Sequence, residues 1–149
     1  LSPQRLSVPL RRILAAAALV PIGFATSYGA IARAAGSQAR AVGRAMATNP
    51  LYPIVPCHRV VGADMSLVGY GGKQDERALA AKLARLRAEA RGMAGPREIA
   101  IPDAPDHALP VIPVERVLEA AARSAGRRER TKRRRAAREA SRGLQLELL

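Results

Sequence analysis

The sequence of 149 residues is poor in the residue types that cross-link small proteins or hold metal ions. It contains one cysteine, two histidines, no tryptophan and only 3% aromatic residues. A single cysteine excludes an internal disulfide framework and a cysteine-rich zinc cluster. His58 and His107 add too few ligands for a structural zinc site. We therefore expect neither a metal ion nor a cofactor.

Acidic residues are also scarce, because 12 Asp and Glu face 25 Lys and Arg and leave a formal net charge of +13. This excess predicts a polyanionic partner, either nucleic acid or an anionic membrane surface. Hydrophobic residues make up 48% of the chain, which excludes wholesale disorder. Since many of them are alanine, we expect a small core that is mainly helical.

A long hydrophobic run is missing as well. Arg11 and Arg12 precede the apolar segment 13–20, an arrangement that resembles a signal peptide. This segment ends at Pro21, far short of the roughly 20 residues that cross a bilayer. Its neighbourhood also shows helical spacing of apolar residues: Leu10, Ile13, Leu14 and Ala17. We therefore favour a core-facing helix in a cytoplasmic protein that has no membrane partner.

Charge and proline divide the chain into three parts. Residues 1–92 carry a net charge of +9 and are interpreted as one domain. Residues 93–112 are rich in proline, which interrupts helices and central strands, so we expect an irregular linker. Residues 113–149 form a basic tail. Its apolar spacing from Val114 predicts a helix that ends at Gly126.

The segment Arg127–Arg142 contains nine basic and two acidic residues. Its composition favours a solvated or disordered tail, although the block remains compatible with a helix. The functional alternative is an auxiliary nucleic-acid-binding arm whose affinity would depend steeply on salt.

Two short helices joined by a tight turn are predicted within the first part. Ser27 can cap a helix over residues 28–35, which Gly36 ends. A second helix, about residues 40–47, closes at Asn49-Pro50. This arrangement is typical of a helix-turn-helix. The predicted fold class is therefore mainly α, with a winged-helix-like DNA-binding domain and short β elements.

Cys57 stands between Pro56 and His58 and is followed by Arg59. Structural cysteines usually have apolar neighbours, whereas cationic neighbours favour the nucleophilic thiolate. Adjacent side chains on an extended chain point to opposite faces, so a water between Cys57 and His58 is as plausible as a direct ion pair. A Cys-His pair on its own is more often incidental than catalytic.

The surroundings of Cys57 resemble the C-terminal domain of the O6-alkylguanine-DNA alkyltransferases over about residues 8–92. The resemblance rests on Pro21-Ile22-Gly23, Thr26-Ser27-Tyr28-Gly29, Ile31-Ala32, Gly36, Arg40-Ala41-Val42-Gly43, Asn49-Pro50, Pro56-Cys57-His58-Arg59-Val60-Val61, Gly69-Tyr70-Gly71-Gly72 and the spacing of Lys82, Leu86 and Glu89. It implies direct-reversal DNA repair. An alkyl group of O6-alkylguanine in double-stranded DNA would be transferred irreversibly to Cys57, once per molecule, by a monomer associated with the nucleoid.

The resemblance also implies a role for each residue of the reaction site. The target base would be flipped into a pocket, and Tyr28 would donate a proton or hydrogen bond to the departing guanine. His58, through a water, and Glu89 would remove the thiol proton of Cys57, while Asn49 would hold the nearby turn.

The resemblance assigns further residues to DNA and to the base pocket. Arg40 would fill the space that the flipped base leaves in the stack. The other positions expected at DNA are Ala39, Ala41, Arg44 and Arg59. The positions expected in the base pocket are Val60, Tyr70 and Gly71.

Three departures from the family pattern keep alternatives open. Gly71-Gly72 follows Tyr70 directly, without the serine that many relatives have. About six extra residues precede Lys82, which makes Glu76 an alternative to Glu89. The family's N-terminal domain would be absent, because only 20 residues precede Pro21. The alternatives are a non-catalytic, damage-sensing or regulatory protein of the alkyltransferase-like type, which has tryptophan in place of the cysteine, and an inactive fragment.

Overall fold

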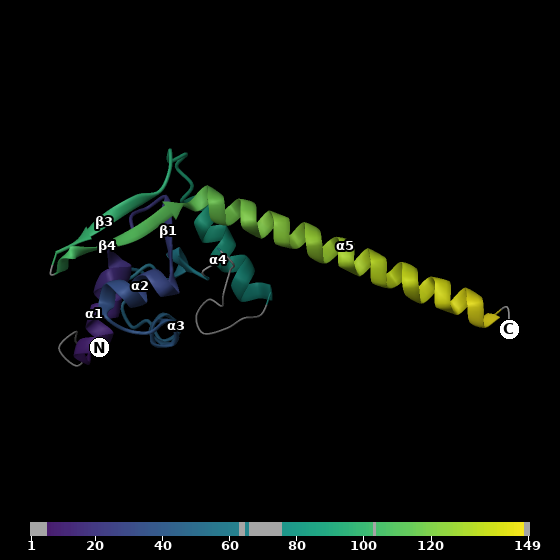
Figure 1. Cartoon of the computed structure of the whole chain (residues 1–149), viewed down its shortest axis with the longest axis horizontal. Coiled ribbons are helices and arrows are strands. Elements are labelled where there is room, and N and C mark those ends of the chain that lie inside the picture. Colours follow the sequence, from purple (N-terminus) through teal and green to yellow (C-terminus); the bar gives the residue numbers. More distant parts are fainter. Residues whose placement is uncertain (1–5, 63–64, 66–75, 103, 148–149) are drawn as a thin grey trace.

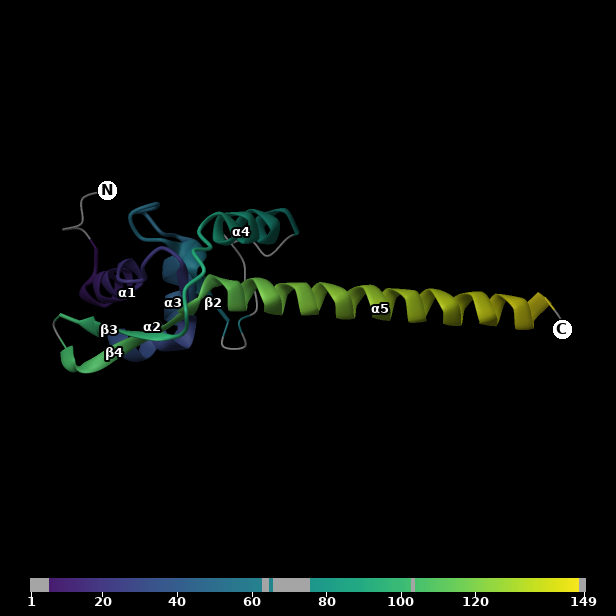
Figure 2. The same ribbon diagram turned by 90° about the horizontal axis from the view of Figure 1, so that it is seen from above.

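The computed structural model describes residues 6–62, 65, 76–102 and 104–147 (Figure 1). A small domain of helices and strands occupies one end, and one long helix projects from it (Figures 1 and 2). The elements are α1 (Val8–Ala18), β1 (Phe24–Ser27), α2 (Tyr28–Ala35), α3 (Ala39–Ala47), the 3-10 turn η2 (Cys57–Arg59), β2 (Val60–Val61), α4 (Glu76–Ala88), β3 (Arg97–Ile101), β4 (Ala104–Pro113) and α5 (Val114–Glu147).

The expected helix near the start of the chain is confirmed as α1. The Ser7 hydroxyl accepts a hydrogen bond from the backbone N–H of Leu10 and caps the first turn. The helix buries Ile13, Leu14 and Ala17 against the rest of the core. None of the helices in the part of the chain that the structure describes combines the length and apolarity needed to cross a bilayer.

The predicted pair of short helices is confirmed as α2 and α3. The Ser27 hydroxyl accepts from the N–H of Ala30 at 3.0 Å, and this bond fixes the start of α2. Gly36 ends α2 with φ near +66°, a left-handed conformation that favours glycine. The helix α3 begins only three residues later, at Ala39. Local capping signals therefore define both helices and the turn between them.

A four-stranded sheet separates two layers of helices. The strand order is β2-β1-β4-β3, with β1 parallel to β2 and the other pairs antiparallel. Phe24 and Val60 belong to the core cluster with α1, α2 and α3. Their neighbours Ala25 and Val61 belong to a second cluster with α4 and the start of α5. Alternation along the strands thus ties both layers to one sheet.

The expected irregular structure of residues 93–112 is wrong, because β3 and β4 form an antiparallel hairpin there. Leu109 and Val111 alternate along β4 and are fully buried. Pro110 between them supplies a carbonyl that accepts from the Thr26 hydroxyl at 2.8 Å. The ladder between β4 and β1 includes only Ile112 and Pro113 of β4, so the missing N–H of Pro110 removes no bond from it.

The expected helix end at Gly126 is also wrong, since α5 continues to Glu147. The tail is therefore helical, the second of the two forms that its composition allowed. Val114 and Val117 anchor the first turns in the core, and every described side chain from Arg127 onward is exposed. Gly126 costs the helix about 1 kcal/mol, but the residues that follow it are mostly strong helix formers.

Candidate active site

A turn closed by Asn49 leads directly to Cys57. The side-chain amide of Asn49 donates to the carbonyl of Val55 at 2.7 Å, and its oxygen accepts from the N–H of Leu51 at 3.1 Å. The chain then enters η2, which begins with Cys57. Cys57 is only 7% exposed, so it is buried in the domain rather than displayed on its surface.

His58, Arg59 and Glu89 form one hydrogen-bonded cluster behind the thiol. The Nε2 atom of His58 lies 2.8 Å from Oε1 of Glu89. Arg59 donates from Nε to both carboxylate oxygens, at 3.0 and 3.1 Å, and from Nη2 to Oε2. Its Nη1 atom donates to the carbonyl of Val20 at 2.7 Å. The guanidinium therefore fixes the carboxylate, and the carboxylate fixes the imidazole.

The cluster keeps His58 neutral and Glu89 ionised near pH 7. Burial lowers the pKa of His58, and the charges of Arg59 and Arg85 lower it further, against an opposing effect of Glu89. Burial alone would raise the pKa of Glu89, but the hydrogen bonds and charges of Arg59 and His58 outweigh it and hold that pKa below its usual value. Tyr52 packs edge-on against the imidazole, with ring centroids 6.3 Å apart.

The hydrogen bond to Glu89 determines which imidazole nitrogen can accept a proton. An ionised carboxylate only accepts hydrogen bonds, so Nε2 of His58 must carry the proton in the neutral ring. The other nitrogen, Nδ1, is then a free acceptor. It is buried and has no hydrogen-bond partner among the residues that the structure describes. The ring is therefore poised as a base at Nδ1.

Tyr28 is the first residue of α2 and is half-buried. Burial raises its pKa to about 12, and the neighbouring charge of Cys57 acts in the same direction. Its hydroxyl is protonated at neutral pH, and the raised pKa makes it a hydrogen-bond donor that releases its proton less readily. The N-terminal cap at Ser27 fixes the position of Tyr28, because it starts the helix there.

Lys82 is a site residue that the sequence analysis did not assign a role. It lies on the inner face of α4 with Ala78 and Leu86, and its side chain is fully buried. Its ammonium donates to the carbonyl of Val60 at 2.5 Å and lies 5.7 Å from the ring centroid of Tyr28. Burial lowers its pKa to about 8, although the charge of Cys57 opposes the shift. The sequence did contain a signal for this burial, because Lys82 stands four residues after Ala78 and four before Leu86, on the apolar face of the helix.

The helix α3 presents a basic face to solvent. Arg40, Arg44 and Ala39 are exposed, and Ala41 is half-buried. The opposite face of α3 packs into the core through Val42, Ala45 and Met46. Arg40 and Arg44 are four residues apart, which places them on the same side of the helix.

Several other expected site residues are placed differently. Arg59, expected at DNA, binds Glu89 and the carbonyl of Val20. Val60 is fully buried in β2, and its carbonyl accepts from Lys82. Tyr70 and Gly71 lie outside the described residues.

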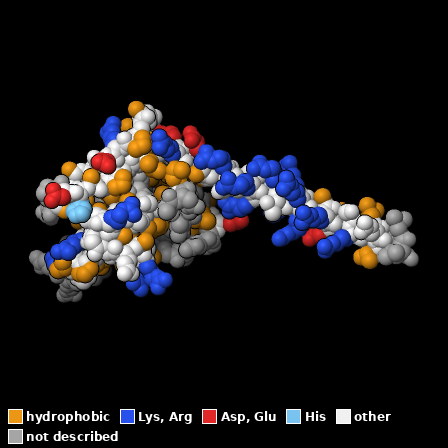
Figure 3. Space-filling view, viewed as in Figure 1, with side chains coloured by type: hydrophobic (Ala, Val, Ile, Leu, Met, Phe, Trp, Pro, Cys, Tyr) orange, Lys and Arg blue, Asp and Glu red, His pale blue; other side chains and the backbone are white. Residues whose placement is uncertain are grey.

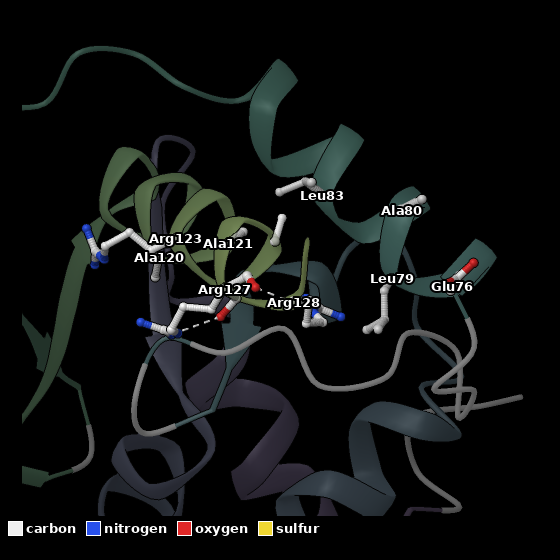
Figure 4. Close-up of a pocket in the computed structure, with 11 residues that line it drawn as sticks. Glu76, Leu79, Ala80, Leu83, Ala120, Ala121, Arg123, Arg127 and Arg128 are labelled. Atoms are coloured by element: carbon white, nitrogen blue, oxygen red, sulfur yellow. Dashed lines mark hydrogen bonds between the residues drawn. The ribbon is translucent and has the colours of Figure 1, made fainter. Parts of the chain in front are cut away.

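Of the two candidate glutamates, the structure brings Glu89 to the cluster. Glu76 begins α4, about 20 Å from Glu89 by the helical rise. It lines a groove of about 480 Å³ between α4 and α5 instead (Figure 4). No group of three or more potential metal ligands occurs within the described ranges.

The part of the chain that contains the cluster and Cys57 matches a known protein family. Residues 10–91 match the model of the 6-O-methylguanine DNA methyltransferase, DNA binding domain. The chain belongs to this family. The matched residues include Tyr28, α2, α3, Cys57 and Glu89, so they contain every element of the candidate active site.

Relatives in the 6-O-methylguanine DNA methyltransferase family carry two different descriptions. A methylated-DNA–protein-cysteine methyltransferase of Mycobacterium leprae is 50% identical over 64 residues, which are 42% of this chain and 39% of that protein. A DNA base-flipping protein of Thermus thermophilus is 43% identical over 74 residues, which are 50% of this chain and 47% of that protein. The chain thus spans less than half the length of these two relatives.

Solved structures of the family support the same fold. The crystal structure of Mycobacterium tuberculosis OGT in complex with DNA aligns with a TM-score of 0.51 and 42% identity. The alignment covers 58% of this chain and 52% of that one. A mainly helical fold with a small sheet is therefore shared with OGT, and α5 extends past the family-matched residues 10–91.

Proposed function

We propose that the protein repairs alkylated DNA by transferring the alkyl group of O6-alkylguanine to Cys57. The observation that carries the proposal is the cluster behind the thiol. His58 offers an unpartnered Nδ1, its other nitrogen is held by Glu89, and Arg59 fixes Glu89. Such an arrangement of base and orienting carboxylate is what activates a thiol nucleophile.

The transfer is a single displacement at the alkyl carbon. The thiol proton of Cys57 passes through a water to Nδ1 of His58, and the thiolate attacks the carbon. The new C–S bond forms as the C–O6 bond breaks, and the electron pair of that bond stays on the guanine oxygen. The ionised carboxylate of Glu89 stabilises the imidazolium that results.

The leaving guanine needs a proton, since it would otherwise depart as an anion. Tyr28 supplies it or donates a hydrogen bond to the ring, because a phenol is protonated at neutral pH. Burial raises the pKa of Tyr28 to about 12, which favours donation of a hydrogen bond over complete loss of the proton. Lys82 acts as a positioning residue. Its charge lies beside the Tyr28 ring and interacts with Cys57, so it places a cation next to the reacting residues.

Double-stranded DNA is the proposed partner, with the base turned out of the stack before transfer. The exposed arginines of α3 support this assignment, since cationic side chains suit the negative potential of a DNA groove. Arg40 would fill the space that the flipped base leaves. The chain would act as a monomer, and its single thiol would react once.

The test is a mass measurement on the peptide that contains Cys57. After incubation with duplex DNA that carries O6-methylguanine, we expect this peptide to gain one methyl group. The Cys57→Ser variant should bind the same duplex and gain nothing. A wild-type peptide of unchanged mass, from protein shown to be folded by circular dichroism, would refute alkyl transfer.

The similarity to a DNA base-flipping protein favours one further candidate, a damage sensor that binds the lesion without repairing it. The same incubation separates the two. A sensor would bind the O6-methylguanine duplex more tightly than undamaged DNA while the mass of the Cys57 peptide stays constant.

A further inference from the structure

The projecting part of α5 has no role in the proposed transfer. We use the term basic arm for its segment Arg127–Arg142, which contains nine of the 25 basic residues of the chain. Figure 2 shows α5 leaving the domain as a straight rod, and Figure 3 shows blue side chains gathered along it. Every described side chain of the arm is exposed.

Four of the nine basic residues of the arm share one side of the helix. At about 100° per residue, four arginines fall within about 80° of one another around the helix axis: Arg127, Arg134, Arg138 and Arg142. The side directly opposite carries Glu129, Ala136, Ala140 and Gly143, with Lys132 and Arg133 at its two margins. The arm therefore presents a cationic stripe rather than a uniformly charged rod.

The four arginines of the stripe have no ion-pair partner among the residues that the structure describes. Among the described residues, the only ion pair on the arm joins Glu129 to Arg133 at 3.5 Å, away from the stripe. Like charges also repel one another at four-residue spacing, in the pairs Arg128 and Lys132, Arg130 and Arg134, Arg134 and Arg138, and Arg138 and Arg142. A polyanion would relieve this repulsion, whereas water alone only screens it.

The length of the stripe fits a nucleic-acid backbone. From Arg127 to Arg142 the helix rises about 22 Å, and a duplex carries one phosphate charge per roughly 1.7 Å of its axis. A duplex segment of that length therefore carries more phosphates than four arginines can contact. Arginine is also well suited to phosphate, because its planar group donates two hydrogen bonds at once.

The stripe begins at the edge of the domain rather than beyond it. Arg127 and Arg128 line the groove between α4 and α5, and both donate to Ser124, one to its hydroxyl and one to its carbonyl (Figure 4). Leu79 and Leu83 of α4 form part of the other wall. Cationic surface is therefore continuous from the α4–α5 groove onto the arm.

We propose that the basic arm binds the phosphate backbone of duplex DNA independently of the base and of any damage. Its contacts add affinity that varies with salt but not with sequence. The reactive cluster around Cys57 takes no part in them, so this binding does not depend on the proposed alkyl transfer.

The test measures the affinity of the full chain for an undamaged 30-base-pair duplex over a range of salt concentrations. In the triple variant Arg134→Gln, Arg138→Gln, Arg142→Gln, glutamine keeps helix propensity and removes three stripe charges. We expect at least a tenfold loss of affinity at low salt. The slope of log affinity against log salt should become shallower by about 2 to 3, at roughly 0.9 per phosphate contact.

The matched control is Arg133→Gln, which removes a charge of the same arm away from the stripe and should leave the slope unchanged. Equal slopes for wild type and triple variant, with both shown to be helical by circular dichroism, would overturn the proposal. So would a triple variant that keeps its DNA affinity but no longer binds phosphatidylserine vesicles, since the stripe would then serve a membrane surface.

Discussion

The reactive cluster and the basic arm use charge in opposite ways. In the cluster, His58, Arg59 and Glu89 are largely buried and each is bound to another member. In the arm, nine basic side chains are exposed. Among the described residues of the arm, only Glu129 and Arg133 form an ion pair. Charge in the cluster is therefore a matter of geometry, because each group orients the next. Charge in the arm is a matter of number, because Arg133 is the only described arginine there that has an ion-pair partner.

The two regions should differ most in how much stability and activity the protein loses when a glutamate is replaced by glutamine. Glu89→Gln leaves the guanidinium of Arg59 without its carboxylate in a site where the two side chains are 13% and 16% exposed. We expect the unfolding free energy to fall by about 3 kcal/mol. Alkyl transfer should fall at least 100-fold, because the imidazole loses the group that sets its tautomer. Urea denaturation and the mass assay measure these two losses.

The control is Glu129→Gln in the arm, which removes the exposed partner of Arg133. This change should alter the unfolding free energy by less than about 0.5 kcal/mol. The effect of Glu89→Gln should also depend on pH. The pKa of Glu89 is below its usual value, so its stabilisation is complete above about pH 5 and is lost as the pH falls through the lowered pKa. A constant difference between wild type and Glu89→Gln down to pH 2 would contradict the assigned ion pair.

The second prediction concerns the two described lysines, one buried and one exposed. The folded state lowers the pKa of Lys82 to about 8, so it releases its proton while the unfolded chain retains it up to about pH 10.5. The unfolded state then binds more protons, and stability must rise between these pH values. Relative to Lys82→Met, the wild type should gain up to about 3 kcal/mol of unfolding free energy from pH 8 to pH 10.5.

Lys132→Met in the arm is the matched control for the loss of a lysine, because the side chain of Lys132 is exposed. The rate of transfer supplies the second measurement. At pH 7 Lys82→Met should react at least tenfold more slowly than wild type while remaining folded, since the thiolate of Cys57 loses its buried cation. Unchanged transfer kinetics in folded Lys82→Met would mean that this lysine serves packing alone.

A third prediction separates the exposed arginines of α3 from those of the arm. If Arg40 fills the gap left by a flipped base, Arg40→Ala should slow transfer from duplex DNA about tenfold more than transfer from the free alkylated base. Arg133→Ala in the arm should leave both rates unchanged. Rates are obtained from the mass of the Cys57 peptide against time. Equal losses on the two substrates would show that Arg40 acts elsewhere in the reaction.

The same contrast explains which features the sequence could predict. The pair α2 and α3 follows from local signals, since a serine cap at Ser27 and a left-handed Gly36 fix their ends within a few residues. The resemblance supplied Cys57 and His58 through a contiguous motif. It also supplied Glu89, which only the fold could distinguish from Glu76, because the choice depends on how α4 packs against η2.

The features that the sequence could not predict depend on tertiary partners. Five prolines from Pro96 to Pro113 indicated an irregular linker, yet β4 pairs with β3 across Pro110, and the β1 ladder includes only Ile112 and Pro113 of β4. The resemblance placed Arg59 at DNA, whereas its bonds to Glu89 and to the carbonyl of Val20 depend on the packing of distant segments. Gly126 was a helix stop by local rules, but the helix formers on both sides of it continue α5.

The smallest expected effect is also the one that best separates a binding arm from a structural strut. Arg138 takes part in two like-charged pairs, with Arg134 and Arg142, each of which destabilises the helix by about 0.2–0.5 kcal/mol. Arg138→Gln should therefore raise the helical signal of the free protein slightly. It should also lower affinity for undamaged duplex about threefold and reduce the salt slope by about 0.9.

Arg133→Gln loses a favourable pair instead, so it should lower helicity without weakening DNA binding. Circular dichroism and a salt titration on both variants give the comparison. If α5 serves only as a structural strut, losing the charge of Arg138 should strengthen the helix and leave DNA affinity unchanged. If it binds DNA, the same charge destabilises the free helix but stabilises the complex with the phosphates, so its loss should lower DNA affinity.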